Sequence, residues 1–244
     1  MQATAINDRS AVTGAIQLAS TRSGVDFSYL YAQAKLESGL NPNAHAATSS
    51  ARGLYQFTAA TWLDIVRKHG SANGLGWAAD ALNAGASPTA RAAILDLRRD
   101  PQVAASMAAA FANDNRASLE AGLGRPATAT DLYIAHFLGA SGALKFLRAH
   151  DADPQAAGVG VAVAAAHANH AVFYAADGTP RSLAAIYDRF AAKLTGTAVP
   201  PTGNRLPVQL AASSPLARAG LASAPQATPQ TVRLAYLALA GLGV

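Results

Sequence analysis

The chain has 244 residues, of which 51% are apolar and 14% are charged, and it contains no cysteine, which excludes disulfide bonds, thiol catalysis and cysteine-ligated metals. Its length fits one domain of roughly 150–200 residues with a sizeable core, followed by a tail. The net charge of +5 suits an anionic partner. No arginine cluster is interleaved with aromatic residues, however, so nucleic acid is not an expected partner.

Targeting and membrane signals are absent from the sequence as given. No run reaches the roughly 18 apolar residues of a membrane span. The first ten residues lack the basic and apolar regions of a signal peptide. Either the chain is not exported by that route, or the sequence is that of a mature or shortened chain.

Helical periodicity, capping residues and an almost complete lack of strand signals predict an all-α domain. We expect helices over residues 10–24, 26–39, 58–70, 88–100, 101–122, 128–150, 154–170 and 181–195. Asp26 and Thr58 are expected as N-caps, and Gly39 and Gly70 as stop signals. The sequence predicts a loop over 71–87.

Glycine and proline mark further boundaries. The helices at 88–100 and 101–122 both open with proline at a first-turn position, where its missing N–H costs nothing. Gly139 and Gly142 are expected to break the helix at 128–150.

The composition changes after about residue 196. The stretch 198–230 is rich in proline, alanine and serine, which is typical of a linker or an irregular arm. Residues 231–244 could form a short apolar helix, and 189–244 contains no acidic residue. We therefore divide the chain into a domain at 10–195 and a Pro/Ala-rich basic tail at 196–244. The tail is either a disordered linker or an arm that contacts a protein, the membrane surface or an anionic polymer.

Glu37 stands out because only two of the 14 acidic residues are glutamates. On a helix, Phe27, Leu30, Ala34 and Glu37 share one face, so Glu37 continues the face that meets the core. It also lies in the last turn, where the helix dipole opposes ionisation. Apolar packing and this dipole favour a protonated carboxyl group, as a general acid requires. Alternatively, Glu37 lies at the edge of that face and reaches water.

The segment after Glu37 contains no other acid up to Leu63. It supplies hydroxyl, amide and aromatic groups instead: Ser38, Asn41, Asn43, Thr48, Ser49, Ser50, Tyr55, Gln56, Phe57 and Trp62. Such groups bind sugar hydroxyls and acetamido groups and stack on sugar rings. One isolated acid beside them fits a glycosidic cleavage in which the substrate supplies the nucleophile, although Asp64 or Asp131 could still fold into the site.

The motif 36-LESGLNPNA-44 followed by 53-GLYQF-57 resembles the catalytic core of the soluble lytic transglycosylases, in the goose-type lysozyme-like superfamily. The stretch 48-TSSARGLYQFTAATW-62 is most similar to the phage-like and alphaproteobacterial type. The resemblance implies a lysozyme-like fold, no cofactor and no metal. It also implies that Glu37 protonates the bond between N-acetylmuramic acid and N-acetylglucosamine. Glu37 would then accept the C6 hydroxyl proton, leaving a 1,6-anhydromuramic end.

The same resemblance implies a set of substrate-binding residues: Ser38, Ser49, Ser50, Gly53, Tyr55, Gln56, Phe57, Tyr133 and His136. Which of Thr48, Ser49 and Ser50 assists is left open. The family often has Ala-Tyr-Asn-Ala-Gly on a helix facing the glutamate, and here the stretch reads 135-AHFLGASGA-143. A hydrogen bond from this helix to Glu37 is therefore an open question, with His136 in the tyrosine place and Tyr133 one turn away from Phe137.

Two rival functions remain open from the sequence. A muramidase of the same fold would admit water, and a non-catalytic adaptor would bind glycan strands in a secretion, flagellar or phage assembly. His167 and His170 have a spacing that can bind metal, but no third ligand lies near them in the sequence, so no metal site is expected. We expect a monomer that acts on peptidoglycan in the periplasm or cell envelope.

Overall fold

The computed structural model describes residues 2–47 and 49–197, and this part of the chain is all-α, as predicted. Its α-helices are α1 (Gln2–Ser23), α2 (Phe27–Ser38), α3 (Ala59–His69), α4 (Gly76–Asn83), α5 (Pro88–Asp96), α6 (Pro101–Leu123), α7 (Ala129–Ala152), α8 (Gly158–Val161), α9 (Val163–Ala168), α10 (His170–Phe173) and α11 (Leu183–Thr197). Two 3₁₀ helices, η1 (Ser71–Asn73) and η2 (Leu97–Arg99), join them. No β-strand occurs among the described residues, and only isolated bridges such as His45 with Arg52 do.

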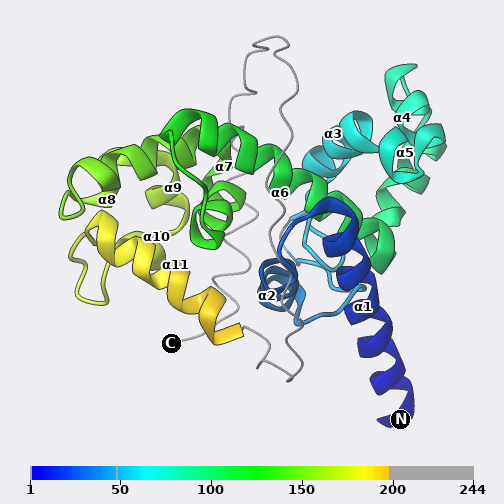
Figure 1. Cartoon of the computed structure of the whole chain (residues 1–244), viewed down its shortest axis with the longest axis horizontal. Helices are drawn as coiled ribbons and strands as arrows, with labels where there is room; N and C mark the ends of the chain where they lie inside the picture. The colour runs from blue at the N-terminus through cyan, green and yellow to red at the C-terminus, as the bar shows by residue number, and fades with distance from the viewer. Residues whose placement is uncertain (1, 48, 198–244) are drawn as a thin grey trace, which may run out of the picture.

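The long helices α6 and α7 organise the molecule. Figure 1 shows α3, α4 and α5 gathered at one end and α8, α9 and α10 at the other, with α6 and α7 running between them. Helix α6 packs against α1, α3 and α7, and α11 packs against α7 and α2. Helix α2 therefore ends in the middle of the molecule, in contact with α1, α6 and α11.

Local capping chemistry fixes most helix ends. The Asp26 carboxylate accepts a hydrogen bond from the Tyr29 backbone N–H at the start of α2, and the Thr58 hydroxyl does the same at the start of α3. Gly39 ends α2 in the left-handed conformation, at φ 64°. These three predicted ends are confirmed. Gly70 ends α3 with right-handed helical dihedrals and leads directly into η1.

The predictions of a loop at 71–87 and of a single helix at 154–170 are wrong. The first segment contains η1 and α4, because Ala78, Ala79 and Leu82 form a short apolar stripe that is buried. The second is divided into α8, α9 and α10 by non-helical dihedrals at Ala162 and Asn169.

The predicted break in the helix at 128–150 is confirmed at Gly139, which has φ 74° and ψ 158° inside α7. Gly142 does not interrupt the helix. The prolines behave as predicted, since Pro88 and Pro101 open α5 and α6.

A chain of aromatic rings forms the centre of the core. The Phe57 ring centroid lies 5.6 Å from that of Trp62 on α3 and 6.2 Å from that of Phe111 on α6. The Phe111 ring in turn lies 6.4 Å from the imidazole of His136 on α7. These contacts join the loop after α2 to three helices around its end.

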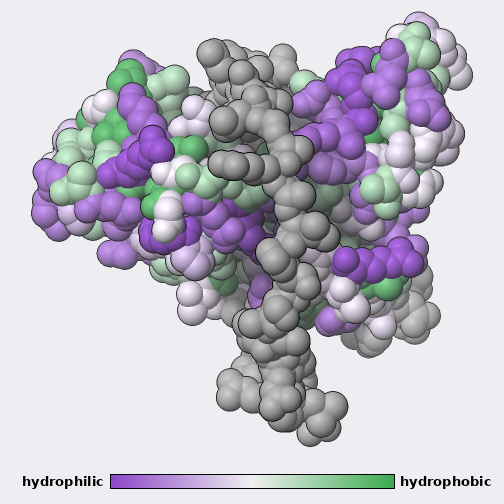
Figure 2. Space-filling view, turned by 45° about the horizontal axis from the view of Figure 1, so that its top comes forward, coloured by the Kyte–Doolittle hydropathy of each residue, from purple (hydrophilic) through white to green (hydrophobic). Residues whose placement is uncertain are grey.

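The surface carries few large apolar side chains. Among the described residues the exposed ones are Leu18, Trp77 and Val163, which lie on three different helices. Figure 2 shows hydrophilic residues over much of the visible described surface. Among the helices in residues 2–47 and 49–197, none combines the length and the hydropathy that a membrane span requires. The predicted arm and terminal helix at 198–244 lie outside the described residues, so the domain boundary remains a prediction.

Candidate active site

Glu37 lies in the last turn of α2, on the predicted buried face. Leu30 and Ala34 on the same face are fully buried, and Phe27 at the helix start is half-buried. The Glu37 side chain is 1% exposed, so the alternative in which it reaches water from the edge of this face is wrong. The helix end that holds it is fixed by left-handed dihedrals at Gly39 and Leu40.

Helix α7 meets this carboxyl group through His136. The His136 Nε2 atom lies 3.2 Å from Glu37 Oε1, and the two side chains are 2% and 1% exposed. The contact from α7 that the sequence left open is therefore present, and it comes from His136. Tyr133 stacks on the imidazole instead, with ring centroids 6.1 Å apart and an interplanar angle of 11°.

Each member of this pair keeps one atom without a hydrogen-bond partner. Glu37 Oε2 and His136 Nδ1 are both buried, and neither has a partner among the described residues. A buried polar atom without a partner costs free energy, so such an atom needs an explanation. At Glu37 the unpartnered oxygen is the one available to a bound ligand.

Two phenol groups and one ammonium group respond to the charge of the Glu37 carboxyl group. Burial raises the pKa of Tyr29, Tyr55 and Tyr133, and the Glu37 charge raises those of Tyr29 and Tyr133 further. The phenol groups of these tyrosines are therefore neutral at neutral pH. Burial and the neighbouring Arg189 lower the pKa of Lys193 on α11, and the Glu37 charge opposes this change.

The loop after α2 folds back on the end of that helix. The Ser38 hydroxyl donates to the Leu54 carbonyl at 2.8 Å. The Gln56 amide donates to the carbonyls of Gly53, at 2.8 Å, and Ala44, at 3.2 Å. Gln56 has φ 48°, which is strained for a residue with a side chain. Ser38, Gly53 and Gln56 are thus brought close to the helix end that carries Glu37.

Arg98, in η2, is a loop-positioning residue that sequence reasoning missed. It is 5% exposed, and its Nη1 donates to the carbonyls of Ser50, at 2.6 Å, and Phe57, at 3.0 Å. Burial lowers its pKa to about 10, so it is still a cation at neutral pH. No sequence motif marks it, because its partners are backbone carbonyls 48 and 41 residues away.

Gly53 fits this arrangement because a side chain would not. It has φ 81°, and a Cβ atom there would lie 1.9 Å from the Arg98 carbonyl oxygen. The loop and η2 therefore approach each other at a distance that only glycine permits.

The remaining predicted residues bind the protein's own backbone or lie in the core. Ser49 accepts from the Ala51 N–H and Ser50 from the Ala59 N–H, both at 3.1 Å. Tyr55 and Phe57 are 0% and 1% exposed. Thr48 lies outside the described residues. A substrate contact by any of these residues stays a prediction.

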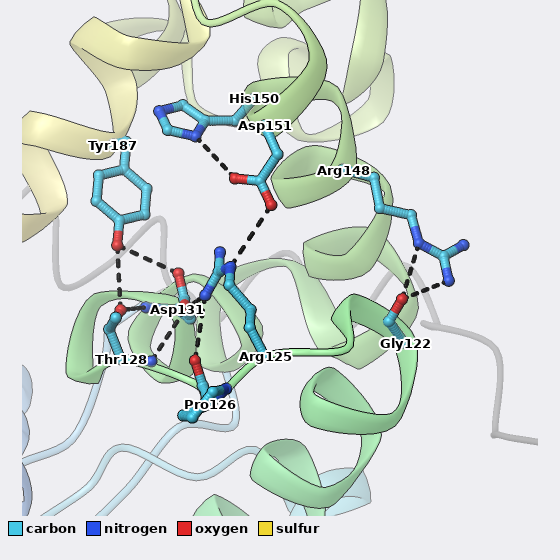
Figure 3. A network of polar contacts seen from close by, with 9 residues as sticks. All are labelled: Gly122, Arg125, Pro126, Thr128, Asp131, Arg148, His150, Asp151 and Tyr187. Atoms are coloured by element: carbon cyan, nitrogen blue, oxygen red, sulfur yellow. Dashed lines mark hydrogen bonds and ion pairs between the residues drawn. The ribbon is translucent and has the colours of Figure 1, made fainter.

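Neither alternative acid is free to assist Glu37. The Asp64 side chain is 71% exposed and pairs with Arg67 on the surface of α3. Asp131 is fully buried and accepts from Arg125 at 2.7 Å, from the Thr128 backbone at 2.9 Å and from the Tyr187 hydroxyl at 3.2 Å (Figure 3). The oxygens of Asp131 are thus occupied in fixing the corner between α6, α7 and α11.

Metal-ligating side chains do not gather in the part of the chain that the structure describes. It contains no group of three or more histidine, cysteine, aspartate or glutamate residues that could hold an ion. Of the two histidines with metal-compatible spacing, His170 stacks on Tyr174 with ring centroids 4.1 Å apart.

A comparison with known families matches the segment that contains Glu37. Residues 14–129 match the family model described as "Transglycosylase SLT domain". The match includes Glu37, the loop after it and Arg98, and it ends at the first residue of α7. His136, which completes the contact to Glu37, lies beyond the matched segment.

Proposed function

We propose that Glu37 is the single carboxyl group that performs the reaction of this chain. Residues 14–129 belong to the transglycosylase SLT family, and the chain is accordingly a lytic transglycosylase that acts on peptidoglycan. The observation that carries this proposal is the burial and the hydrogen bonding of the Glu37 carboxyl group. It is enclosed by protein, one oxygen contacts His136, and the other has no partner among the described residues. Both aspartates that could have served as a second acid are engaged elsewhere.

The reaction opens with proton transfer to the leaving group. Glu37 gives the proton on Oε2 to the oxygen that joins C1 of N-acetylmuramic acid to C4 of N-acetylglucosamine. The C1–O bond breaks, and its electron pair stays on that oxygen, which leaves as the hydroxyl group of N-acetylglucosamine. The positive charge at C1 is held by the ring oxygen or by the substrate's own 2-acetamido group.

The second step returns the proton. The C6 hydroxyl oxygen of the same muramic residue attacks C1 and forms the 1,6-anhydro bond. Its proton passes to the Glu37 carboxylate, which restores the starting acid. The two steps consume no water, so a site that keeps its carboxyl group away from solvent suits this chemistry.

The burial of Glu37 also limits how the substrate can reach it. Because Glu37 Oε2 is enclosed, a sugar ring can reach it only when the surrounding groups move aside. Arg98 and Gly53 hold the loop in place during this opening, and Ser38 and Gln56 keep it on the end of α2. We propose that Ser49, Ser50, Tyr55, Phe57, Tyr133 and His136 line the opened groove.

The substrate lies in the cell envelope, and the finer setting is part of the proposal. We place the chain in the periplasm, as a monomer bound to glycan strands. The basic tail at 196–244 would contact the membrane surface or a protein partner. Comparing the chain with a version that ends at residue 197 tests the role of the tail. If the tail is such an arm, the shorter version should pellet differently with wall or membrane and should keep its activity.

Product chemistry tests the reaction itself. Purified peptidoglycan is digested with the chain, and the soluble fragments are analysed by mass spectrometry. We expect 1,6-anhydromuropeptides. Fragments with reducing ends, heavier by one water molecule, would make the chain a muramidase. A chain that pellets with the wall and releases nothing would be an adaptor.

A further inference from the structure

We propose that His136 is a positioning residue for Glu37. Its Nε2–H donates to Glu37 Oε1 and thereby directs the transferred proton to Glu37 Oε2. This inference rests on the proposed role of Glu37 as acid and base. His136 lies outside the segment that matches the family, so the match does not assign it a role.

The hydrogen-bonding environment of the imidazole selects one tautomer. His136 Nε2 faces Glu37 Oε1 at 3.2 Å, whereas Nδ1 is buried with no partner among the described residues. A proton on Nδ1 would be a buried donor without an acceptor, which is rarer and more costly than an acceptor without a donor. The proton therefore resides on Nε2, and Nδ1 carries the lone pair.

Aromatic neighbours fix the direction of that N–H group. Tyr133 stacks on the imidazole at 6.1 Å, and Phe111 meets it edge-on at 6.4 Å with an interplanar angle of 74°. Tyr133 is itself held by Phe190 of α11, with ring centroids 5.7 Å apart. A ring packed on two sides cannot turn away from Glu37 without disturbing α6 and α11.

The donated hydrogen bond changes strength during the reaction. When substrate is bound and Glu37 carries its proton on Oε2, the glycosidic oxygen accepts that O–H, and the bond from His136 joins two neutral groups. Once the proton has left for the glycosidic oxygen, the acceptor is a carboxylate, and a hydrogen bond to an ionised acceptor is about twice as strong. His136 therefore stabilises the carboxylate that the acid step creates.

Other groups that face Glu37 do not replace this donor. Tyr29 of α2 and Tyr133 of α7 are buried, neutral phenols, and no hydrogen bond joins either of them to Glu37 among the described residues. Lys193 of α11 is a cation whose pKa the Glu37 charge raises, and among the described residues the ion pair of Glu37 is with His136.

Two variants of His136 separate positioning from packing. His136→Phe keeps a ring between Tyr133 and Phe111 but has no donor, and His136→Gln keeps an N–H group that cannot titrate. We expect His136→Phe to lower kcat about 10- to 100-fold with KM little changed. This is the effect of losing one hydrogen bond to a charged group. Its alkaline limb of activity moves to higher pH, because a carboxylate without a donor holds its proton longer. His136→Gln recovers most of kcat.

Either of two results overturns the proposal. Wild-type kcat and pH profile in His136→Phe would mean that the ring serves packing alone. A loss in His136→Gln as large as that in His136→Phe would mean that the imidazole itself exchanges protons. Melting temperatures of both variants show whether a lower kcat reflects unfolding.

A measurement without substrate keeps the inference separate from the proposed reaction. ¹⁵N NMR of the histidine side chains, with the His136 signals assigned by their loss in His136→Gln, reports which ring nitrogen is protonated. We expect a protonated Nε2 and an unprotonated Nδ1 at neutral pH. A proton on Nδ1, or on both nitrogens, contradicts the proposal even if anhydromuropeptides form. Reducing-end products with a protonated Nε2 would instead overturn the proposed transglycosylation and leave the role of His136 intact.

Discussion

At the scale of single residues, Arg98 and Gly53 hold the loop beside the buried contact between Glu37 and His136. The close approach at Gly53 gives a prediction with a matched control. Gly53 and Gly85 have almost the same left-handed dihedral, φ 81° and φ 83°, but only Gly53 has an atom in the way of a side chain. Gly85→Ala should cost about 1 kcal/mol, the strain of the dihedral alone. Gly53→Ala should cost about 2–4 kcal/mol, because the Arg98 carbonyl must also move. Denaturant unfolding measures both losses, and equal losses would mean that the backbone of η2 moves aside without cost.

The sequence predicted the buried face on which Glu37 lies, because the spacing of Leu30 and Ala34 is a local property of the chain. It offered His136 as a candidate on the facing helix and left the contact with Glu37 open, since periodicity carries no information about residues 99 positions apart. Arg98 could not be predicted, because its partners are backbone carbonyls, which every residue has.

At the scale of elements, the corner between α6 and α7 is held by a buried charge. The Asp131 carboxylate belongs to a capping box with Thr128 and also binds Arg125 and Tyr187. Asp131→Asn keeps the size of the side chain but loses the charge that these donors require. We expect a loss of about 1–3 kcal/mol in the free energy of unfolding.

The surface pair formed by Asp64 and Arg67 is the control for this prediction. Asp64→Asn breaks an exposed ion pair and should change the free energy of unfolding by less than about 1 kcal/mol. Similar losses in Asp64→Asn and Asp131→Asn, measured by urea titration, would contradict a structural role for the buried network.

The elements also show where sequence reasoning stops. Helices with a capping side chain at the start and a left-handed glycine at the end, such as α2, were predicted well because both signals are local. Helix α4 was not predicted because it is short, buries only two alanines and a leucine, and has glycines next to it that indicate a loop. The alanine-rich run at 154–170 was predicted as one helix on propensity, and tertiary packing divided it.

At the scale of the whole molecule, three buried phenols predict a loss of stability at alkaline pH. Burial raises the pKa of Tyr29, Tyr55 and Tyr133 above the unfolded value of 10.0. Above that pH the unfolded chain loses phenol protons that the folded chain retains, so stability is complete below pH 10 and falls above it. Each tyrosine contributes up to about 1.4 kcal/mol per pH unit.

Tyr55→Phe tests the sign of this effect. The Tyr55 hydroxyl has no partner among the described residues, so its removal should leave the stability at pH 7 nearly unchanged. Between pH 10 and pH 11 the variant should lose stability less steeply than the wild type. Parallel curves from thermal melts across this range would mean that Tyr55 ionises freely in the folded chain.

The proposed role of Glu37 as the single acid and base of a peptidoglycan lytic transglycosylase can be tested with the chain's other glutamate as the control. Glu120 accepts a hydrogen bond from the Ala127 backbone, which a glutamine can also accept. The measurement is the rate at which Glu37→Gln and Glu120→Gln release anhydromuropeptides from purified peptidoglycan. We predict a loss of about 100- to 10,000-fold for Glu37→Gln and near wild-type release for Glu120→Gln. Release by a folded Glu37→Gln at the wild-type rate would show that another group performs the reaction.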